Sequence, residues 1–168
     1  EMACLVVPQE FSREDPLDRN LFRLVDIGTT DENDLREQIQ WLFLALHGEY
    51  GEDGQVQRQL QLLGMPYTGS GPKASELAFD KARTKEVLRE AGLPTPDWTV
   101  IDAKDGSWPT GWEAPLVLKP VEQGSSVGLQ FVDSRDQWTE ALMDAWAGGG
   151  PLICEPRVVG REITVGIL

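Results

Sequence analysis

A lysine followed by a loop of glycine and serine is the strongest chemical signal in the sequence. Lys119 ends the apolar run PLVLKP, and the loop GSSVG follows at residues 124–128. Glycines let the backbone bend sharply so that N–H groups face an oxyanion, and a nearby lysine adds positive charge. These residues predict a phosphate site, but a hairpin turn with a surface lysine explains them equally well. The P-loop pattern GxxxxGK[ST] is absent.

Three other charged positions fit a nucleotide only in a suitable context. Lys81, in DKARTK, shares a predicted helix face with Lys85, and by itself it fits a solvated face. Glu155 closes an apolar run and Glu162 begins another. A carboxylate at a strand end can accept hydrogen bonds from an adenine amino group or from ribose hydroxyls. An edge charge that limits aggregation is the simpler interpretation of both glutamates.

His47 is the only histidine, and it stands where an apolar run enters the loop HGEYGEDG. Ligands bind at the carboxyl ends of strands in open α/β sheets, so His47 is a candidate pocket residue. A structural histidine bonded to the turn fits this position as well. The acidic residues of the loop lack the DxDxDG spacing of a calcium loop, so no metal site is predicted there.

Apolar periodicity predicts the elements that position these residues in the first half. A strand is predicted at residues 3–7. Leu35, Ile39 and Leu42 are spaced like one helix face, and the apolar run at 41–48 predicts that this helix passes into a buried, parallel-type strand. Val56, Leu60 and Leu63 predict an amphipathic helix that ends at Gly64. A loop rich in Pro, Gly and Ser follows.

The second half alternates strands and helices in an α+β pattern. One helix is predicted from Ser75 as N-cap to Gly92, and a second begins at the capping box Ser134/Gln137. Trp138, Leu142, Ala145 and Trp146 line one face of the second helix. Strands are predicted at residues 97–102, 115–121, 127–132, 151–156 and 161–168.

Composition narrows the class of protein. The chain has 168 residues, is 40% hydrophobic and carries a formal net charge of −13, which disfavours binding to nucleic acids and to anionic membranes. No apolar run reaches the length of about 18 residues that a membrane span needs. Cys4 and Cys154 fit buried, reduced thiols of a cytosolic protein. Both ends fall within apolar runs, so we interpret the chain as an internal piece of a longer protein.

Several segments in order carry a resemblance to a known family: ALHGEYGEDGQVQ, LLGMPYTGSGPKASELAFDKARTK, AGLPTP, VLKPVEQGSSVG and GREITVGIL. They resemble the D-alanine–D-alanine ligase family of ATP-grasp enzymes over about residues 41–168. The resemblance implies an α/β protein of α+β layers with a partial ATP-grasp fold. It implies a partial Rossmann-like N-terminal domain at residues 1–72, a central ATP-grasp domain at 73–156 and the start of a C-terminal domain at 157–168.

The resemblance also implies roles for individual residues. Lys81 and Lys119 match lysines that bind nucleotide phosphates, and Glu155 and Glu162 match residues that contact adenine and ribose. Ser125 and His47 match residues beside the first D-alanine. The loop that closes over the phosphates corresponds to Glu122, Gly124, Ser125, Ser126 and Val127. The chain departs from the family at Pro156, where a lysine or another residue with an N–H donor is common.

The implied activity is ATP-dependent joining of two D-alanines through an acyl phosphate, for peptidoglycan synthesis in the cytoplasm. The cofactors would be ATP and Mg²⁺, with the metal ligands expected past Leu168, and the protein would be a homodimer. The 168-residue chain alone is predicted to be inactive. Two alternatives stay open: a ligase that accepts D-lactate or D-serine, and a non-catalytic ATP-grasp module that only binds nucleotide.

Overall fold

A computed structural model describes residues 3–7, 23–26, 41–102, 104, 106–124 and 126–165 of the chain, with side chains from residue 41 onward. The chain forms two compact units, Glu1–Asp80 and Lys81–Leu168. Within the described residues, no helix is both long and apolar enough to span a bilayer. The division into domains at residues 1–72, 73–156 and 157–168 remains a prediction.

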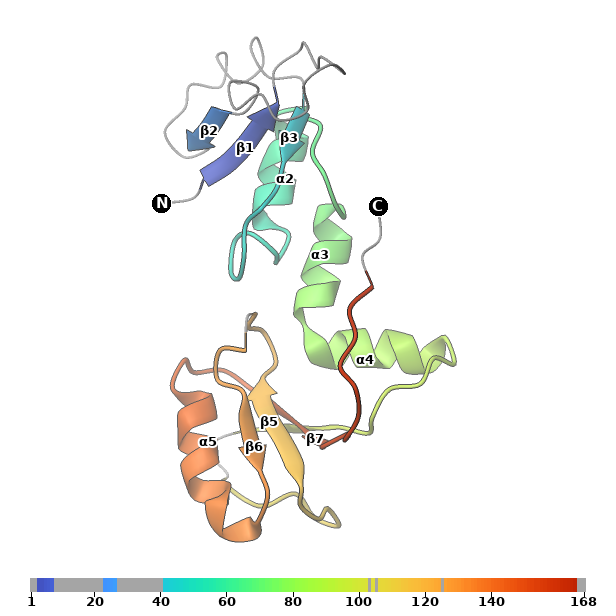
Figure 1. Cartoon of the computed structure of the whole chain (residues 1–168), viewed down its shortest axis with the longest axis vertical. Helices are drawn as coiled ribbons and strands as arrows, with labels where there is room; N and C mark the ends of the chain where they lie inside the picture. The colour runs from blue at the N-terminus through green and yellow to red at the C-terminus, as the bar shows by residue number, and fades with distance from the viewer. Residues whose placement is uncertain are drawn as a thin grey trace. The chain divides into compact units, whose positions relative to one another are not determined.

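The first unit contains a small antiparallel sheet with the order β2-β1-β3 (Figure 1). The strands are β1 Ala3–Val7, β2 Arg23–Asp26 and β3 Trp41–Phe43. The strand predicted at residues 3–7 is therefore confirmed. Leu35 and Ile39 of the predicted helix face lie outside the described residues, and Leu42, the third residue of that face, belongs to β3.

The prediction of a buried, parallel-type strand at residues 41–48 is wrong. Strand β3 pairs antiparallel with β1 and ends at Phe43, and only Leu42 of its three residues is buried. On its other side Leu42 forms only an isolated parallel bridge with Tyr67, and the Leu44 N–H donates to the Thr68 hydroxyl at 3.0 Å. An apolar run shows that a segment is partly buried, but the direction of its neighbouring strand depends on residues distant in sequence.

Helix α2, Gln55–Leu62, confirms the predicted amphipathic helix. Val56 and Leu60 are fully buried and pack with Leu42 and Met65. Gly64 has a φ of +66°, the left-handed conformation expected of a glycine that ends a helix. Local periodicity and a terminal glycine were sufficient signals here because both act within one turn of the helix.

The single helix predicted from Ser75 is instead two helices, α3 Pro72–Phe79 and α4 Lys81–Glu90. Ser75 as N-cap is wrong, because this residue is buried inside α3. The helix begins earlier because proline fits the first turn, where its missing N–H leaves no backbone bond unmade.

The break between these helices falls at Asp80, whose ψ of 103° is extended. The Lys81 N–H then donates to the carbonyl oxygen of Val121 at 3.1 Å. This bond satisfies a donor at the start of α4 that would otherwise lack a partner. No local stop signal marks Asp80, so the sequence pattern runs through the break.

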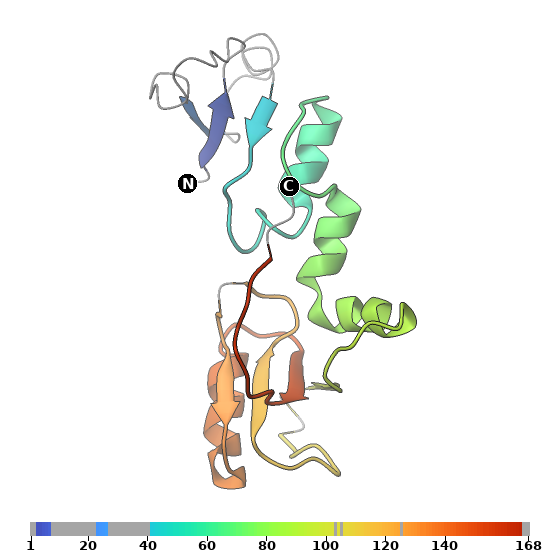
Figure 2. The same cartoon turned by 45° about the vertical axis from the view of Figure 1, so that its right-hand side comes forward.

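The second unit is built on a four-stranded antiparallel sheet with the order β4-β7-β5-β6. The strands are β4 Thr99–Ile101, β5 Leu116–Pro120, β6 Gln130–Val132 and β7 Leu152–Pro156. Figure 2 shows β6, β5 and β7 side by side. These four predicted strands are confirmed, although each is shorter than predicted.

The strand predicted at residues 161–168 is wrong for its described part. Residues 161–165 form no strand, and the side chains of Ile163 and Val165 are 79% and 78% exposed. A strand needs a neighbour for its backbone hydrogen bonds. No such pairing is recorded for residues 161–165 among the part of the chain that the structure describes.

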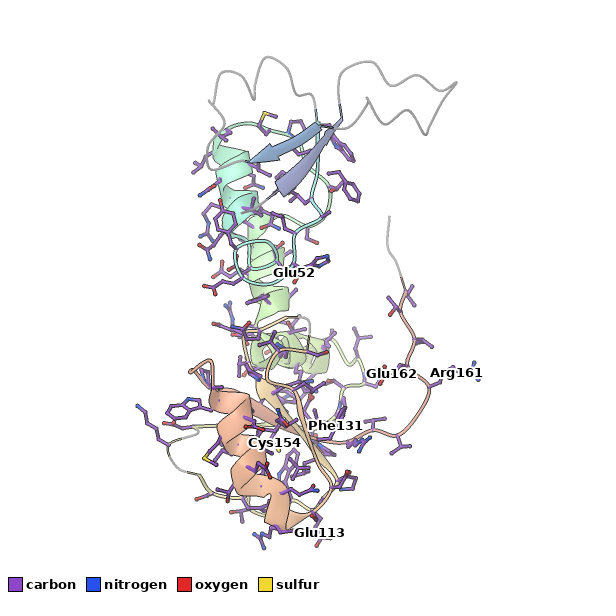
Figure 3. The ribbon with its side chains drawn as sticks, turned by 60° about the vertical axis from the view of Figure 1, so that its left-hand side comes forward. Glu52, Glu113, Phe131, Cys154, Arg161 and Glu162 are labelled. Carbon is purple, nitrogen blue, oxygen red and sulfur yellow. The ribbon has the colours of Figure 1, made fainter. Side chains whose placement is uncertain are left out.

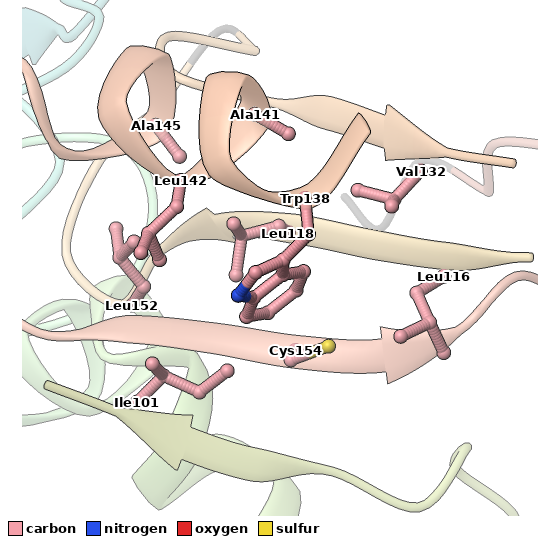
Figure 4. Packing of buried hydrophobic residues seen from close by; sticks show 10 residues of the cluster. All are labelled: Ile101, Leu116, Leu118, Val132, Trp138, Ala141, Leu142, Ala145, Leu152 and Cys154. Atoms are coloured by element: carbon pink, nitrogen blue, oxygen red, sulfur yellow. The ribbon is translucent and has the colours of Figure 1, made fainter. Parts of the chain in front are cut away.

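Helix α5, Trp138–Trp146, covers one face of this sheet and forms the main core with it (Figure 4). The predicted capping box is confirmed in the short helix η2, Arg135–Gln137, where Ser134 and Gln137 bond reciprocally. Of the four residues predicted to line one helix face, Trp138, Leu142 and Ala145 are buried, whereas Trp146 is 39% exposed. Ala141 is buried instead, because it completes the stripe at i, i+3, i+4 and i+7 from Trp138.

Cys154 is fully buried in this core as a free thiol, as predicted. Burial, followed by the negative charge of neighbouring Glu155, raises the pKa of the Cys154 thiol to about 11. The thiol is therefore protonated at neutral pH and behaves as a small apolar side chain. The side chain of Cys4 lies outside the described residues.

Candidate functional site

The face of the sheet opposite α5 carries the charged residues. Side chains alternate along a strand, so Lys119 of β5 and Glu155 of β7 lie on the face that Leu118 and Cys154 do not occupy. In the antiparallel register Val117 faces Glu155, which places Lys119 diagonally next to that glutamate. The Lys119 Nζ and Glu155 Oε2 atoms are 2.6 Å apart.

A second lysine binds the same carboxylate. Lys85 of α4 lies with its Nζ atom 2.6 Å from Glu155 Oε1, and both side chains are about nine-tenths buried. Burial alone raises the pKa of the Glu155 carboxyl, but the hydrogen bonds and charges of Lys119 and Lys85 outweigh it and hold the pKa below its ordinary value. Glu155 is therefore ionised at neutral pH, between two lysines.

Lys81, the first residue of α4, lies at the loop that follows β5. Its Nζ atom donates to the carbonyl oxygens of Val121, at 3.2 Å, and Gln123, at 2.5 Å. These bonds connect residues that are about forty positions apart in sequence. Lys81, which is predicted to bind a nucleotide phosphate, therefore lies beside the glycine-rich loop.

The glycine-rich loop is folded as two overlapping turns. The Val127 N–H donates to the Gly124 carbonyl at 3.0 Å, and the Leu129 N–H donates to the Ser126 carbonyl at 3.2 Å. Gly128 has a φ of +69°, and a Cβ atom there would lie 2.8 Å from Pro120 Cγ. Only glycine fits this position without strain. Ser125 lies outside the described residues.

Lys81, Lys119 and the glycine-rich loop line one cavity of about 310 Å³. The residues around it are Lys81, Lys119, Pro120, Gln123, Gly124, Ser126, Val127 and Leu129. The structure therefore brings together five of the predicted binding residues: Lys81, Lys119, Gly124, Ser126 and Val127. Two ammonium groups beside a turn-forming backbone suit an anion with several oxygens, such as a phosphate group.

Of the other predicted site residues, Glu122, Glu162 and His47 do not line the cavity. Glu122 is exposed and does not line the cavity. Figure 3 shows Glu162 on the extended segment after β7, where its side chain is exposed. His47 is exposed and belongs to the first unit, which contains none of the cavity residues.

In the acidic loop that follows His47, side-chain carboxylates accept hydrogen bonds from backbone N–H groups of the same segment. The Gly48 N–H donates to Glu52, and the N–H groups of Tyr50 and Gln55 donate to Asp53. Burial raises the pKa of Asp53, but these backbone bonds outweigh it and lower the pKa overall. Among the described residues no group of three or more His, Cys, Asp or Glu side chains is arranged to hold a metal ion.

Lys85 is the residue that sequence reasoning missed. The only signal was its spacing of four from Lys81, which placed both lysines on one helix face. It is the one buried residue of α4. Burial of Lys85 depends on Glu155, which lies seventy residues later in the chain, so no local pattern reveals it.

Comparisons with known proteins cover most of the chain. The models for the D-ala D-ala ligase N-terminus and the D-ala D-ala ligase C-terminus match residues 9–70 and 87–168. The D-alanine–D-alanine ligase of Aquifex aeolicus is 44% identical over 128 residues, which are 76% of this chain and 44% of that protein. That of Nitrosomonas europaea is 42% identical over 141 residues, 82% of this chain and 46% of that protein.

The chain is also similar to solved structures of D-alanine–D-alanine ligases. The D-alanine–D-alanine ligase of Bacillus anthracis is 36% identical with a TM-score of 0.66, over 78% of this chain and 45% of that one. The enzyme of Helicobacter pylori, at 22% identity, shows the shared fold alone, with a TM-score of 0.68 over 84% of this chain and 40% of that one.

The chain spans less than half the length of these relatives. Within that span, the expected fold class, a partial ATP-grasp fold of helices and sheets, is confirmed. The matches of both family models, one in each half, agree with the motifs from HGEYGEDG to GREITVGIL. The chain belongs to the D-alanine–D-alanine ligase family.

Proposed function

We propose that this chain supplies the nucleotide-binding part of an ATP-dependent D-alanine–D-alanine ligase. One observation carries the proposal: Lys81 and Lys119 line the same cavity as the loop at residues 124–128. The names of the relatives, which are D-alanine–D-alanine ligases, support the choice of substrate.

In this proposal the cavity holds the ATP phosphates. The positively charged side chains of Lys119 and Lys81 both line the cavity. Hydrogen bonds to the carbonyl groups of Val121 and Gln123 hold Lys81 in this position. Positive groups fixed before the reaction stabilise the charge that moves with a transferring phosphoryl group. The loop at residues 124–128 would exclude water, which would otherwise hydrolyse the reactive intermediate.

The reaction has two steps. A carboxylate oxygen of the first D-alanine attacks the terminal phosphorus of ATP, which gives an acyl phosphate and ADP. The amino group of the second D-alanine then attacks the acyl carbon, loses a proton and releases inorganic phosphate. Mg²⁺ would offset phosphate charge in this reaction, and the described residues offer no cluster of three or more ligands for it.

The remaining site assignments are part of the same proposal. Ser125 and His47 would lie near the first D-alanine, Glu122 would act with the phosphate loop, and Glu155 and Glu162 would serve adenine and ribose. The division at residues 72–73 and 156–157, a homodimer, and a cytoplasmic role in peptidoglycan synthesis follow from the family and belong to the proposal as well.

The test is phosphate release from ATP by the protein expressed from its complete reading frame. Release should require both Mg²⁺ and D-alanine. Lys119→Met should lower kcat/KM for ATP by about 100-fold or more, because a preformed charge at the phosphates is lost. Lys104→Met is the matched control, since the same substitution at an exposed lysine away from the cavity should leave activity unchanged.

Other outcomes decide between the alternatives. If D-lactate or D-serine replaces the second D-alanine with higher kcat/KM, the protein is a ligase of different specificity. If folded protein binds ATP and releases no phosphate with any of these acceptors, the non-catalytic nucleotide-binding module is the correct reading. Equal loss of activity in Lys119→Met and Lys104→Met would contradict the role given to Lys119.

A further inference from the structure

Lys85 is a buried cation that the proposed function leaves without a role. Its side chain is 8% exposed, and lysine is almost never this buried unless it is paired. Its Nζ atom lies 2.6 Å from Glu155 Oε1 and 2.6 Å from Thr95 Oγ1. The same atom lies 5.3 Å from the centre of the Trp98 ring, within the range of a cation–π contact.

Lys85 binds only one of the two carboxylate oxygens of Glu155. Oxygen Oε1 accepts from Lys85, and oxygen Oε2 accepts from Lys119. Lys119 lines the cavity, whereas Lys85 and Glu155 do not. The influence of Lys85 on a ligand in the cavity is therefore expected to pass through Glu155.

The balance of charge shows what Lys85 adds. Two lysines against one carboxylate leave the cluster with one positive charge in excess. Without Lys85, both oxygens of Glu155 would be available to Lys119, and the remaining pair would be neutral. The charge of Lys119 would then be neutralised by Glu155 when a phosphate enters the cavity. The site is partly buried, so charges there are only weakly screened and this neutralisation would weaken the attraction for phosphate.

We propose that Lys85 is a positioning residue for the nucleotide phosphates, which orients Glu155 and keeps the cluster positive so that Lys119 is available at the cavity. This inference rests on the proposed function, in which the cavity takes the ATP phosphates. Lys85 itself touches no substrate. Its contact with Thr95 holds the ammonium group in place, and its contact with Glu155 transmits that placement to Lys119.

The experiment measures ATP affinity and turnover of the complete protein in a set of variants. Lys85→Met should raise the Kd and the KM for ATP about tenfold, the size expected for losing one charge-assisted interaction, while kcat changes less. Lys85→Arg keeps the charge and the donors and should restore most of the affinity. Arg89→Met is the matched control, because Arg89 also lies over Trp98, at 4.6 Å, but has no recorded ion pair with Glu155.

A double-mutant cycle separates positioning from a general loss of stability. In the Glu155→Gln background, Lys85→Met should change the Kd for ATP less than twofold, because its effect passes through Glu155. Circular dichroism and urea unfolding identify variants that do not fold. If Lys85→Met does not fold, Lys85→Gln, which keeps a donor for Glu155 but loses the charge, is expected to show the same rise in Kd.

The outcomes distinguish this inference from the proposed function. Folded Lys85→Met and Lys85→Gln proteins with wild-type Kd and KM for ATP would overturn the inference. An equal effect of Lys85→Met with and without Glu155 would overturn it as well. Wild-type protein that binds ATP but does not turn over D-alanine would refute the ligase proposal, while the Kd series still tests Lys85. Wild-type protein that binds no ATP would refute both.

Discussion

The ammonium group of Lys119 and the carboxylate of Glu155 lie 2.6 Å apart on neighbouring strands of one sheet. The glutamate is 8% exposed, and the lysine side chain is 27% exposed and lines the cavity. One member of the pair is therefore buried inside the second unit, and the other lies at the candidate phosphate site. Changes at Glu155 should affect both stability and ligand binding.

Glu155→Gln should lower the free energy of unfolding by about 3 kcal/mol, because it leaves two lysines near a group that no longer carries a negative charge. Urea unfolding followed by tryptophan fluorescence measures the change. Asp133→Asn is the matched control, since it breaks a more exposed ion pair with Arg157 in the same unit. That substitution should cost less than about 1 kcal/mol. Equal losses in the two variants would contradict the importance of the buried cluster.

The buried cluster also predicts how stability depends on pH. The pKa of Glu155 is lower in the folded protein than its ordinary value of 4.5, so the unfolded chain binds a proton at a higher pH than the folded chain. The stabilisation is complete above pH 4.5 and is lost as the pH falls through the folded pKa.

Urea unfolding from pH 7 to pH 3 tests this dependence. The difference in unfolding free energy between wild type and Glu155→Gln should be constant above about pH 5 and should shrink as the pH falls below 4.5. Comparing the two proteins removes the contributions of other carboxylates that both share. A difference that stays constant down to pH 3 would show that Glu155 has no lowered pKa.

Gly128 gives a prediction about the phosphate loop. Gly128→Ala should destabilise the second unit by about 1–2 kcal/mol, because the new Cβ would meet Pro120 while φ stays in the left-handed region. The same change should raise the KM for ATP, since the loop lines the cavity. Gly148→Ala is the control, because Gly148 has open space around its Cβ position and no positive φ. Wild-type stability and KM in Gly128→Ala would contradict this account.

Much of the fold could be predicted from local patterns. Helix α2, the capping box at Ser134 and Gln137, and the strands around Lys119 and Glu155 all agree with expectation. Each depends on residues within a few positions of one another, such as an apolar stripe or a turn glycine. The lysine and the glycine-rich loop were found in the same way, because they are adjacent in sequence.

The sequence by itself determined the family, the strand that carries Lys119 and the loop beside it. Only the tertiary structure decided the direction of β3, the break at Asp80 and the exposure of residues 161–165. It also decided that Lys85 would be buried against Glu155. These features depend on partners distant in sequence, because hydrogen bonds between strands and the pairing of buried charges form only when the chain folds.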